Sequence, residues 1–290
     1  MQDSPLVSVC LITYNQEKYI TETLEGIVMQ KTDFPVEVII GEDCSTDNTR
    51  KICEEYIRKY PNLLKPLFHN KNKGMMGNWI ATIQACKGKY ITLCEGDDYW
   101  TDPYKLQKQT NLMEVNPDMS LCAHNADILE YGTLRQLPPI EKDILSTTDI
   151  ILQDWGIMTA SIMFRKDAFD IPDWYKNIKN GDYGLQLLVS LKGKIGILPD
   201  VMSVYRKHVE GISTTLRPLS QAAWVIYLLY EFNKYTSGKY KKTIIKKIKR
   251  VYKNQIGFAK EYHLRKAMAT LWFYRFLVPI NPFSIRSLRK

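Results

Sequence analysis

The chain lacks the features that mark several common protein classes. Its six cysteines include no C-x-x-C pair, and no cysteine and histidine have zinc-finger spacing. No run reaches the roughly 18 apolar residues of a membrane span, and the N-terminal stretch carries an acid where a signal peptide needs basic residues. Cys10 and Cys94 lie in apolar, strand-like runs, where a free thiol behaves as a small hydrophobe. We therefore expect a cytoplasmic protein.

Glycine-rich phosphate-binding loops are also missing. The chain contains no G-x-x-x-x-G-K-[ST] sequence, and no G-x-G-x-x-G follows the first expected strand. A diphosphate bound to this chain would therefore be neutralised mainly by a metal ion.

The net charge of +9 is concentrated at one end of the chain. Residues 239–290 contain fifteen Lys and Arg against one acid, Glu261, a charge of +14 that leaves −5 for the other residues. We therefore expect no nucleic-acid partner, because the charge belongs to one segment. The lysines of this segment alternate with apolar residues at helical spacing. That pattern suits a helix at an anionic membrane surface, here the inner face of the plasma membrane, or a helical pair packed on the rest of the chain.

The hydrophobic pattern predicts an α/β fold. Strands are expected within residues 6–15, 36–45 and 87–94, and helices within 16–30, 49–60, 79–86 and 103–116. This alternation predicts a Rossmann-like, mostly parallel sheet flanked by helices. The second half is less regular, with a strand pair in 121–132, a strand near 161–165, a helix near 183–191, and helical structure from Pro218 to about Phe276.

Polar residues follow the first three expected strands, and three of these residues are clustered acids. Ligands of parallel sheets bind at the carboxyl ends of the strands. Glu95, Asp97 and Asp98 follow a buried strand, and such a group suits Mg²⁺ or Mn²⁺. The alternative is that Asp98 and Asp102 lie at the start of a helix, with Thr101 or Asp102 as its cap and Glu95 in solvent.

Four segments in order resemble the inverting glycosyltransferases of family 2, which have the GT-A fold and are common in bacterial polysaccharide assembly. They are LVSVCLITYN, EVIIGEDCSTDNT, NKGMMGNWIATIQACKGKYI and CEGDDYWTDPYKLQKQ. The resemblance covers about residues 5–215. It implies a GT-A domain over 1–215, with a nucleotide-sugar-binding half (1–100) and an acceptor half (101–215), followed by a basic helical region (216–290).

The resemblance implies a nucleotide-sugar donor, a UDP-sugar above all, and a glycan or lipid-linked acceptor. The residues it assigns to the donor are Thr13, Tyr14, Asn15, Asp43, Lys73, Gly74, Asn78, Glu95, Gly96, Asp97 and Arg206. For Asp43 the alternative is a helix cap, although Ser45 and Asp47 are better placed for that. For Lys73, Gly74 and Asn78 the alternative is a plain loop.

The acidic motif departs from the family pattern. The family usually has D-x-D-D, and this chain has E-G-D-D, with Glu95 in the first position. A glutamate reaches further than an aspartate, so Glu95 is assigned to contact with the donor ribose or to indirect metal contact through water. Asp97 and Asp98 are the preferred residues for Mn²⁺ or Mg²⁺, and the sequence does not decide between them.

Transfer with inversion needs a carboxylate base on the acceptor side, and the resemblance assigns this role to Asp182. The alternative for Asp182 is an ordinary helix N-cap, and Asp154 is a rival base. The resemblance also assigns His208 to the metal, Arg206 to the diphosphate, and Thr159 and Ser161 to the acceptor side.

Two other functions remain open from the residues. One is another nucleotide-sugar enzyme such as a nucleotidyltransferase, although TYNQEK is a poor version of the loop that class needs. The other is a non-catalytic protein that binds a membrane surface or nucleic acid through the basic segment.

Overall fold

The computed structural model describes residues 4–154, 156–209, 211 and 218–261. The chain divides into two compact units. The first comprises residues 1–147 and 154–211, and the second comprises residues 148–153 and 212–290.

The first unit is built on one mixed sheet whose strand order is β3-β2-β1-β4-β9-β6-β10-β5. Strands β1 to β4 pair in parallel, as do β6 and β10, whereas β9 joins the two parts antiparallel to both β4 and β6. The strands on this path are β1 (Val7–Thr13), β2 (Val36–Glu42), β3 (Leu64–Phe68), β4 (Tyr90–Glu95), β5 (Tyr99–Trp100), β6 (Met119–Glu130), β9 (Met163–Arg165) and β10 (Lys194–Lys207). Beside it, β7 (Thr133–Gln136) pairs with β6 and β8 (Ile144–Leu145) pairs with β10.

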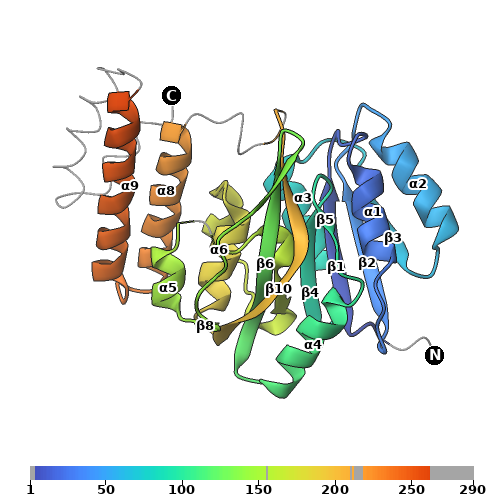
Figure 1. Cartoon of the computed structure of the whole chain (residues 1–290), viewed down its shortest axis with the longest axis horizontal. Coiled ribbons are helices and arrows are strands. Elements are labelled where there is room, and N and C mark those ends of the chain that lie inside the picture. Colours follow the sequence, from blue (N-terminus) through green and yellow to red (C-terminus); the bar gives the residue numbers. More distant parts are fainter. Residues whose placement is uncertain (1–3, 155, 210, 212–217, 262–290) are drawn as a thin grey trace. The chain divides into compact units, whose positions relative to one another are not determined.

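Helices flank this sheet (Figure 1), as the sequence predicted. They are α1 (Ile20–Val28), α2 (Thr49–Lys59), α3 (Gly74–Ala85), α4 (Lys105–Val115) and α6 (Gly181–Val189), with the 3-10 turns η1 (Thr159–Ser161), η2 (Lys166–Ala168) and η3 (Asp173–Asn177). Helix α1 forms because Ile20, Leu24 and Ile27 fall on one face, and all three are buried.

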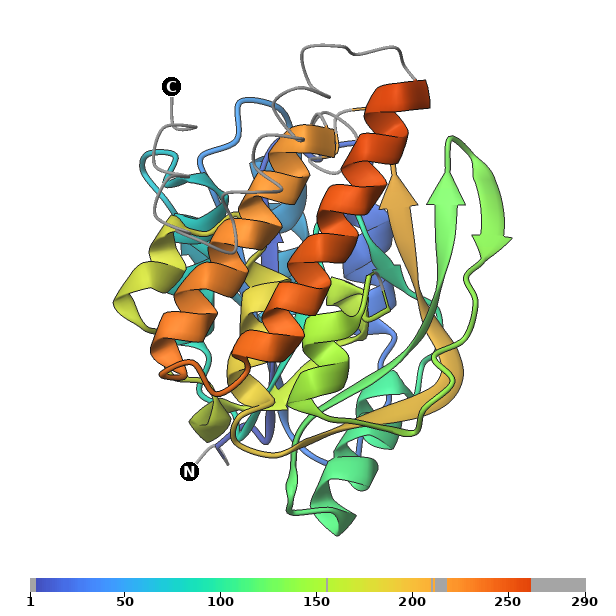
Figure 2. The same ribbon diagram turned by 90° about the vertical axis from the view of Figure 1, so that its left-hand side faces the viewer.

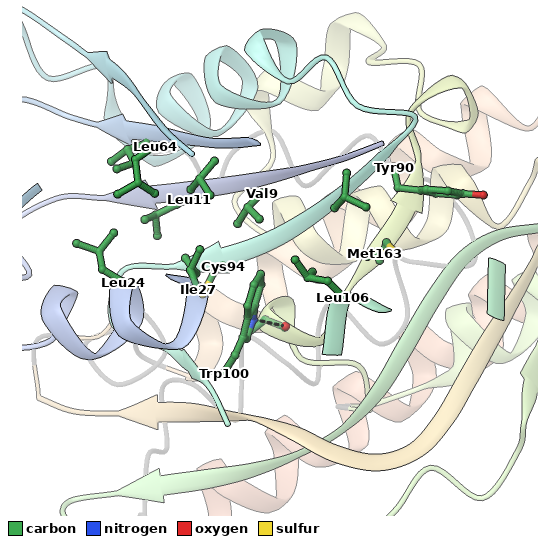
Figure 3. Close-up of a cluster of buried hydrophobic side chains, with 14 of the residues drawn as sticks. Val9, Leu11, Leu24, Ile27, Leu64, Tyr90, Cys94, Trp100, Leu106 and Met163 are labelled. Carbon is green, nitrogen blue, oxygen red and sulfur yellow. Dashed lines mark hydrogen bonds between the residues drawn. The ribbon is translucent and has the colours of Figure 1, made fainter. Parts of the chain in front are cut away.

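The core lies between the strands and these helices (Figure 3). Val9 and Leu11 of β1 and Leu24 of α1 belong to one buried cluster, and Trp100 of β5 is part of the same cluster. The indole of Trp100 is satisfied because its Nε1–H donates to the carbonyl oxygen of Ala160 at 2.9 Å.

Several element boundaries differ from the prediction. The helix expected from Pro103, with Thr101 or Asp102 as cap, begins at Lys105 with Tyr104 as N-cap. The Asp102 carboxylate instead accepts the Tyr104 N–H at 2.7 Å, which makes a turn before the helix. Helix α3 begins five residues before its expected start, at Gly74. Strand β3, which contains Pro66 at the sheet edge, was not predicted.

The second unit contains two long helices, α8 (Pro218–Tyr235) and α9 (Lys241–Glu261), which pack side by side (Figure 2). The end of α5 (Thr147–Leu152) and the residue that follows it contact α9, because Lys247 donates to the Gln153 carbonyl and Arg250 to the Leu152 carbonyl. None of the helices in the described ranges is both long enough and apolar enough to cross a bilayer. The predicted helical structure from 262 to about Phe276 lies outside the described residues.

Candidate functional site

Polar residues meet at the carboxyl ends of β1, β2 and β4. In the register of the parallel strands, Thr13 is opposite Glu42, and Ile12 is opposite Glu95. The predicted convergence of these strand ends at one edge is therefore confirmed.

The loop after β1 is tied to the loop after β2. Asn15 adopts a positive φ of 51°, its Oδ1 accepts the Thr46 N–H at 2.8 Å, and its own N–H donates to the Ser45 hydroxyl at 2.9 Å. Tyr14 is left 44% exposed between these contacts. Thr13 is buried and donates to Gln16 Oε1 at 2.8 Å. Of the predicted donor loop, Tyr14 and Asn15 are therefore exposed, whereas Thr13 is buried.

Asp43 connects the end of β2 to the start of α3. Its side chain is buried, and Oδ1 accepts the Lys73 N–H at 2.7 Å. Asn72, a residue that the sequence analysis missed, donates to the Asp43 carbonyl at 3.1 Å. Gly74 follows with a φ of +73°, which favours glycine. The turn signal N-K-G was present in the sequence, but the contact across 29 positions was not visible there.

Asn78 of α3 is buried against β2. It is 3% exposed, its amide donates to the Gly41 carbonyl at 2.7 Å, and its Oδ1 lies 3.1 Å from His69 Nε2. A Cβ on Gly41 would come within 2.6 Å of Asn78 Oδ1, so α3 packs closely on β2 here. Asn78 therefore joins α3 to the sheet, and its role as a donor residue stays a prediction.

Glycine is required in the acidic turn after β4. A Cβ on Gly96 would lie 2.6 Å from Thr13 Oγ1, so the turn packs directly against the end of β1.

The two aspartates that follow differ sharply in environment. Asp98 is fully buried, and its Oδ1 accepts the Arg206 N–H at 2.8 Å. Burial, and then the Asp97 and Glu95 carboxylates, raise the pKa of Asp98 well above its usual value.

Asp97 is the accessible member of the pair. Its side chain is 20% exposed, and its Oδ2 lies 3.0 Å from Nε2 of His208, which follows β10. The structure thus favours Asp97 over Asp98 as a cation ligand, because Asp98 points into the interior. The sequence had left this choice open.

Glu95, Thr159 and Asp182 form the other side of the cluster. The Thr159 hydroxyl lies 3.4 Å from Asp182 Oδ2. Burial, then Asp97 and Asp182, raise the pKa of Glu95 to about 8, while the hydrogen bond with Thr159 lowers it. Burial likewise raises the pKa of Asp182. The cluster therefore brings the predicted base next to the acidic turn.

One sequence interpretation on the acceptor side is corrected. Asp182 is not an N-cap, because Asn180 holds that position and Asp182 lies within the first turn of α6. Ser161 is fully buried, with its hydroxyl donating to the Met158 carbonyl at 2.7 Å, and its acceptor-side role stays a prediction. The rival base Asp154 is exposed.

Arg206, the predicted diphosphate contact, is engaged elsewhere. Its Nε donates to the Asp97 carbonyl at 2.8 Å, and its guanidinium pairs with Glu22 of α1. This arrangement favours a role in supporting the acidic turn.

The Asp97–His208 pair is the part of this cluster that suits a divalent cation. Within the described residues, no three or more His, Cys, Asp and Glu side chains are grouped to hold a metal ion on their own. Mg²⁺ and Mn²⁺ accept one or two protein ligands and complete their shell with water and substrate phosphates. A partly exposed carboxylate facing an imidazole fits that requirement, provided a phosphate-bearing substrate is present.

Comparison with known proteins identifies similar chains. The family model described as "Glycosyl transferase family 2" matches residues 8–210. An uncharacterized protein of Mycobacterium tuberculosis is 38% identical over 216 residues, which are 71% of this chain and 60% of the relative. The chain thus spans about 60% of the length of this relative. The putative teichuronic acid biosynthesis glycosyltransferase TuaG of Bacillus subtilis is 33% identical, over 77% of this chain and 87% of its own.

Solved structures are similar in fold. S. aureus TarS 1-349 in complex with UDP-GlcNAc has a TM-score of 0.59 at 21% identity, covering 77% of this chain and 66% of that one. The mannosyltransferase PcManGT from Pyrobaculum calidifontis, in complex with GDP-Man and Mn²⁺, has a TM-score of 0.63 at 14% identity, covering 99% of this chain and 79% of that one.

Proposed function

The chain belongs to glycosyl transferase family 2 and has the GT-A fold, and on this premise we propose that it is a glycosyltransferase that moves a sugar from a UDP-sugar to a hydroxyl group of a glycan or lipid-linked acceptor. The observation that carries the proposal is the cluster at the sheet edge, where Asp97 faces His208 and Glu95 interacts electrostatically with both Asp97 and Asp182. Names of relatives in teichoic and teichuronic acid synthesis support a polysaccharide acceptor.

On the donor side, Asp97 and His208 would hold Mn²⁺ or Mg²⁺, which neutralises the departing diphosphate when bound. Mn²⁺ in the PcManGT complex supports this choice of cation. Tyr14 and Asp43 would contact the nucleoside, because the loops that follow β1 and β2 are joined by hydrogen bonds.

On the acceptor side, Asp182 would act as the general base. As the acceptor oxygen bonds to the anomeric carbon, its proton passes to the Asp182 carboxylate, and the bond from that carbon to the diphosphate oxygen breaks with its electron pair on UDP. Partial burial of Asp182 raises its pKa, which makes the carboxylate a better proton acceptor. Thr159 would hold one carboxylate oxygen in place.

We also propose that the second unit attaches the enzyme to an anionic membrane surface. Four exposed lysines of α9, the lysine stripe, recur at i, i+4, i+7 and i+11 and therefore share one face of the helix: Lys242, Lys246, Lys249 and Lys253. The opposite face, with Ile244, Ile248 and Tyr252, is buried within the unit. Attachment would thus be electrostatic, and it suits an acceptor carried on a lipid.

The enzymatic proposal is tested by replacing Asp182 and Asp154 separately with asparagine. We expect Asp182→Asn to lower UDP release from the best donor in a nucleotide-sugar screen by about 100-fold or more. Calorimetry should show that its affinity for UDP with Mn²⁺ stays within about twofold of wild type, because the base does not contact the nucleotide.

Asp154→Asn is the matched control, and its turnover should be unchanged. Turnover retained by Asp182→Asn and lost by Asp154→Asn would reassign the base. A wild-type chain whose UDP affinity does not increase with Mn²⁺ would contradict the metal assignment.

A further inference from the structure

Helix α1 supports the acidic turn from outside the sheet, through residues that belong to none of the motifs above. The Thr23 hydroxyl lies 2.9 Å from the Gly96 carbonyl oxygen and 2.7 Å from that of Asp98. One residue earlier, Glu22 pairs with the guanidinium of Arg206. The first turn of α1 therefore contacts both the turn and the end of β10.

The guanidinium of Arg206 contacts four neighbouring residues. Its Nε donates to the Asp97 carbonyl at 2.8 Å and its Nη2 pairs with Glu22. Its central carbon lies 4.9 Å from the ring centre of Tyr19 and 5.1 Å from that of Tyr99, which are cation–π distances. The side chain is only 13% exposed. Arg206 is thus fixed in one place beside Asp97.

Tyr19 also contacts His208, which together with Asp97 forms the proposed metal-binding pair. The ring centres of Tyr19 and His208 are 4.6 Å apart, and His208 Nε2 faces Asp97 Oδ2 at 3.0 Å. The position of Arg206 and the position of His208 are therefore coupled through Tyr19.

In this arrangement Arg206 does not compete with a cation for the Asp97 carboxylate. An arginine next to a carboxylate normally forms a bidentate ion pair with it, and that pair would occupy the oxygens a cation needs. Here Arg206 contacts the backbone carbonyl of Asp97 and leaves the carboxylate facing His208. Glu22 supplies the negative partner that the guanidinium would otherwise find in Asp97.

We propose that Glu22 is a positioning residue for the metal-binding pair: it holds Arg206 away from the Asp97 carboxylate and so keeps that carboxylate available to a divalent cation. This inference rests on the proposed metal-assisted function, and it adds a residue that acts through another and touches neither substrate nor metal.

The first test compares Glu22→Gln with Glu25→Gln by calorimetry of Mn²⁺ binding in the presence of UDP. Glu25 is a matched control on the same helix, because its carboxylate accepts the Tyr56 hydroxyl and not a residue of the site. We expect Glu22→Gln to lower Mn²⁺ affinity about 10-fold, as loss of a supporting partner of a metal ligand does. Affinity for UDP without metal should not change. Equal Mn²⁺ affinities of the two variants would overturn the proposal.

A double-mutant cycle tests whether Glu22 acts through Arg206. If it does, removing the competing cation with Arg206→Gln makes Glu22 irrelevant, and adding Glu22→Gln to that variant causes no further loss of Mn²⁺ affinity. Independent, additive losses from the two changes would contradict the mechanism.

A metal-free measurement separates this inference from the proposed function. The chain has four histidines, so ring signals in a ¹H–¹³C spectrum are few, and His208→Gln assigns that of His208. We expect Glu22→Gln to shift the His208 signal and leave those of the buried His69 and His124 in place. An unshifted His208 signal would overturn the positioning role. If the wild-type chain binds no Mn²⁺ but Glu22→Gln still shifts the His208 signal, the proposed metal site is refuted. The positioning of His208 by Glu22 is then retained.

Discussion

At the scale of single residues, Lys105 is the least expected side chain in the core. It is fully buried, and its ammonium nitrogen lies 2.7 Å from Gln109 Oε1, 3.1 Å from Thr92 Oγ1 and 4.0 Å from the ring centre of Trp100. These partners are neutral, so they compensate burial only in part. Burial lowers the pKa of Lys105 to about 7.

This pKa predicts how stability depends on pH. Above about pH 7 the folded chain loses the Lys105 proton, whereas the unfolded chain keeps it until about pH 10.4. The unfolded state then binds more protons, so the free energy of unfolding rises with pH, by at most about 1.4 kcal/mol per pH unit. In urea unfolding between pH 6 and 9, Lys105→Met should remove this rise.

The control is Lys108→Met on the same helix. Lys108 pairs with Asp102 and Asp200, and its hydrogen bonds to them raise its pKa, so its removal should leave the rise above pH 7 intact. Parallel curves for wild type and Lys105→Met would show that Lys105 stays charged in the folded chain.

The sequence predicted which residue types gather at the site, but not which of them reach solvent. Asp97 and Asp98 are adjacent and chemically alike, and only the pairing of the Asp98 carboxylate with the Arg206 N–H separates a buried residue from an accessible one. That contact spans 108 positions. Glu22 was missed for the same reason, since a first-turn glutamate is ordinary in any helix.

At the scale of elements, the contact between α1 and β5 sets the position of the acidic turn. Gly26 of α1 packs on the backbone of Trp100, where an added Cβ would lie 2.8 Å from the carbonyl oxygen and 2.9 Å from the nitrogen. Backbone atoms cannot move aside as a flexible side chain can. Helix α1 can therefore lie this close to the turn only because residue 26 is glycine.

We predict that Gly26→Ala destabilises the chain by about 1–3 kcal/mol, the usual cost of forcing extra atoms into a packed interior. The sign is informative, because alanine in an unhindered helix would instead stabilise by about 1 kcal/mol. Urea unfolding measures the difference, with the exposed Thr21→Ala of the same helix as control. A Gly26→Ala variant as stable as Thr21→Ala would contradict the close packing.

Element prediction succeeded where the pattern was local. The apolar runs of β1, β2 and β4 and the amphipathic face of α1 are visible in the sequence, because burial selects them residue by residue. Strand β3 was missed because it lies at the sheet edge and is only partly buried. The start of α4 was misplaced because the Asp102 side chain forms a turn before the helix.

At the scale of the whole molecule, the charge is segregated along the chain. The acids of the candidate site belong to the first unit, and the lysine stripe belongs to the second. The sequence predicted this segregation from composition, and the sheet from the alternation of strands and helices. The division at residue 215 and the role of 239–290 stay predictions, because residues 262–290 are not described.

This separation of charge predicts that the chain binds anionic membranes through the lysine stripe of α9, and that salt weakens this binding. Each lysine near an anionic surface contributes about 1 kcal/mol, so changing the lysine stripe of α9 to glutamine should weaken binding to phosphatidylserine-containing vesicles by roughly 100-fold or more. Raising the salt concentration should do the same to wild type, because the apolar face of α9 is buried within the unit and unavailable for insertion. Vesicle flotation of the full chain measures both effects.

The control replaces four exposed lysines of the first unit, Lys31, Lys51, Lys59 and Lys87, which lowers the net charge equally. Equal weakening by the two sets would mean that net charge alone drives binding, and undiminished binding at high salt would mean that apolar contacts drive it. Either result would remove the reason to assign membrane attachment to α9.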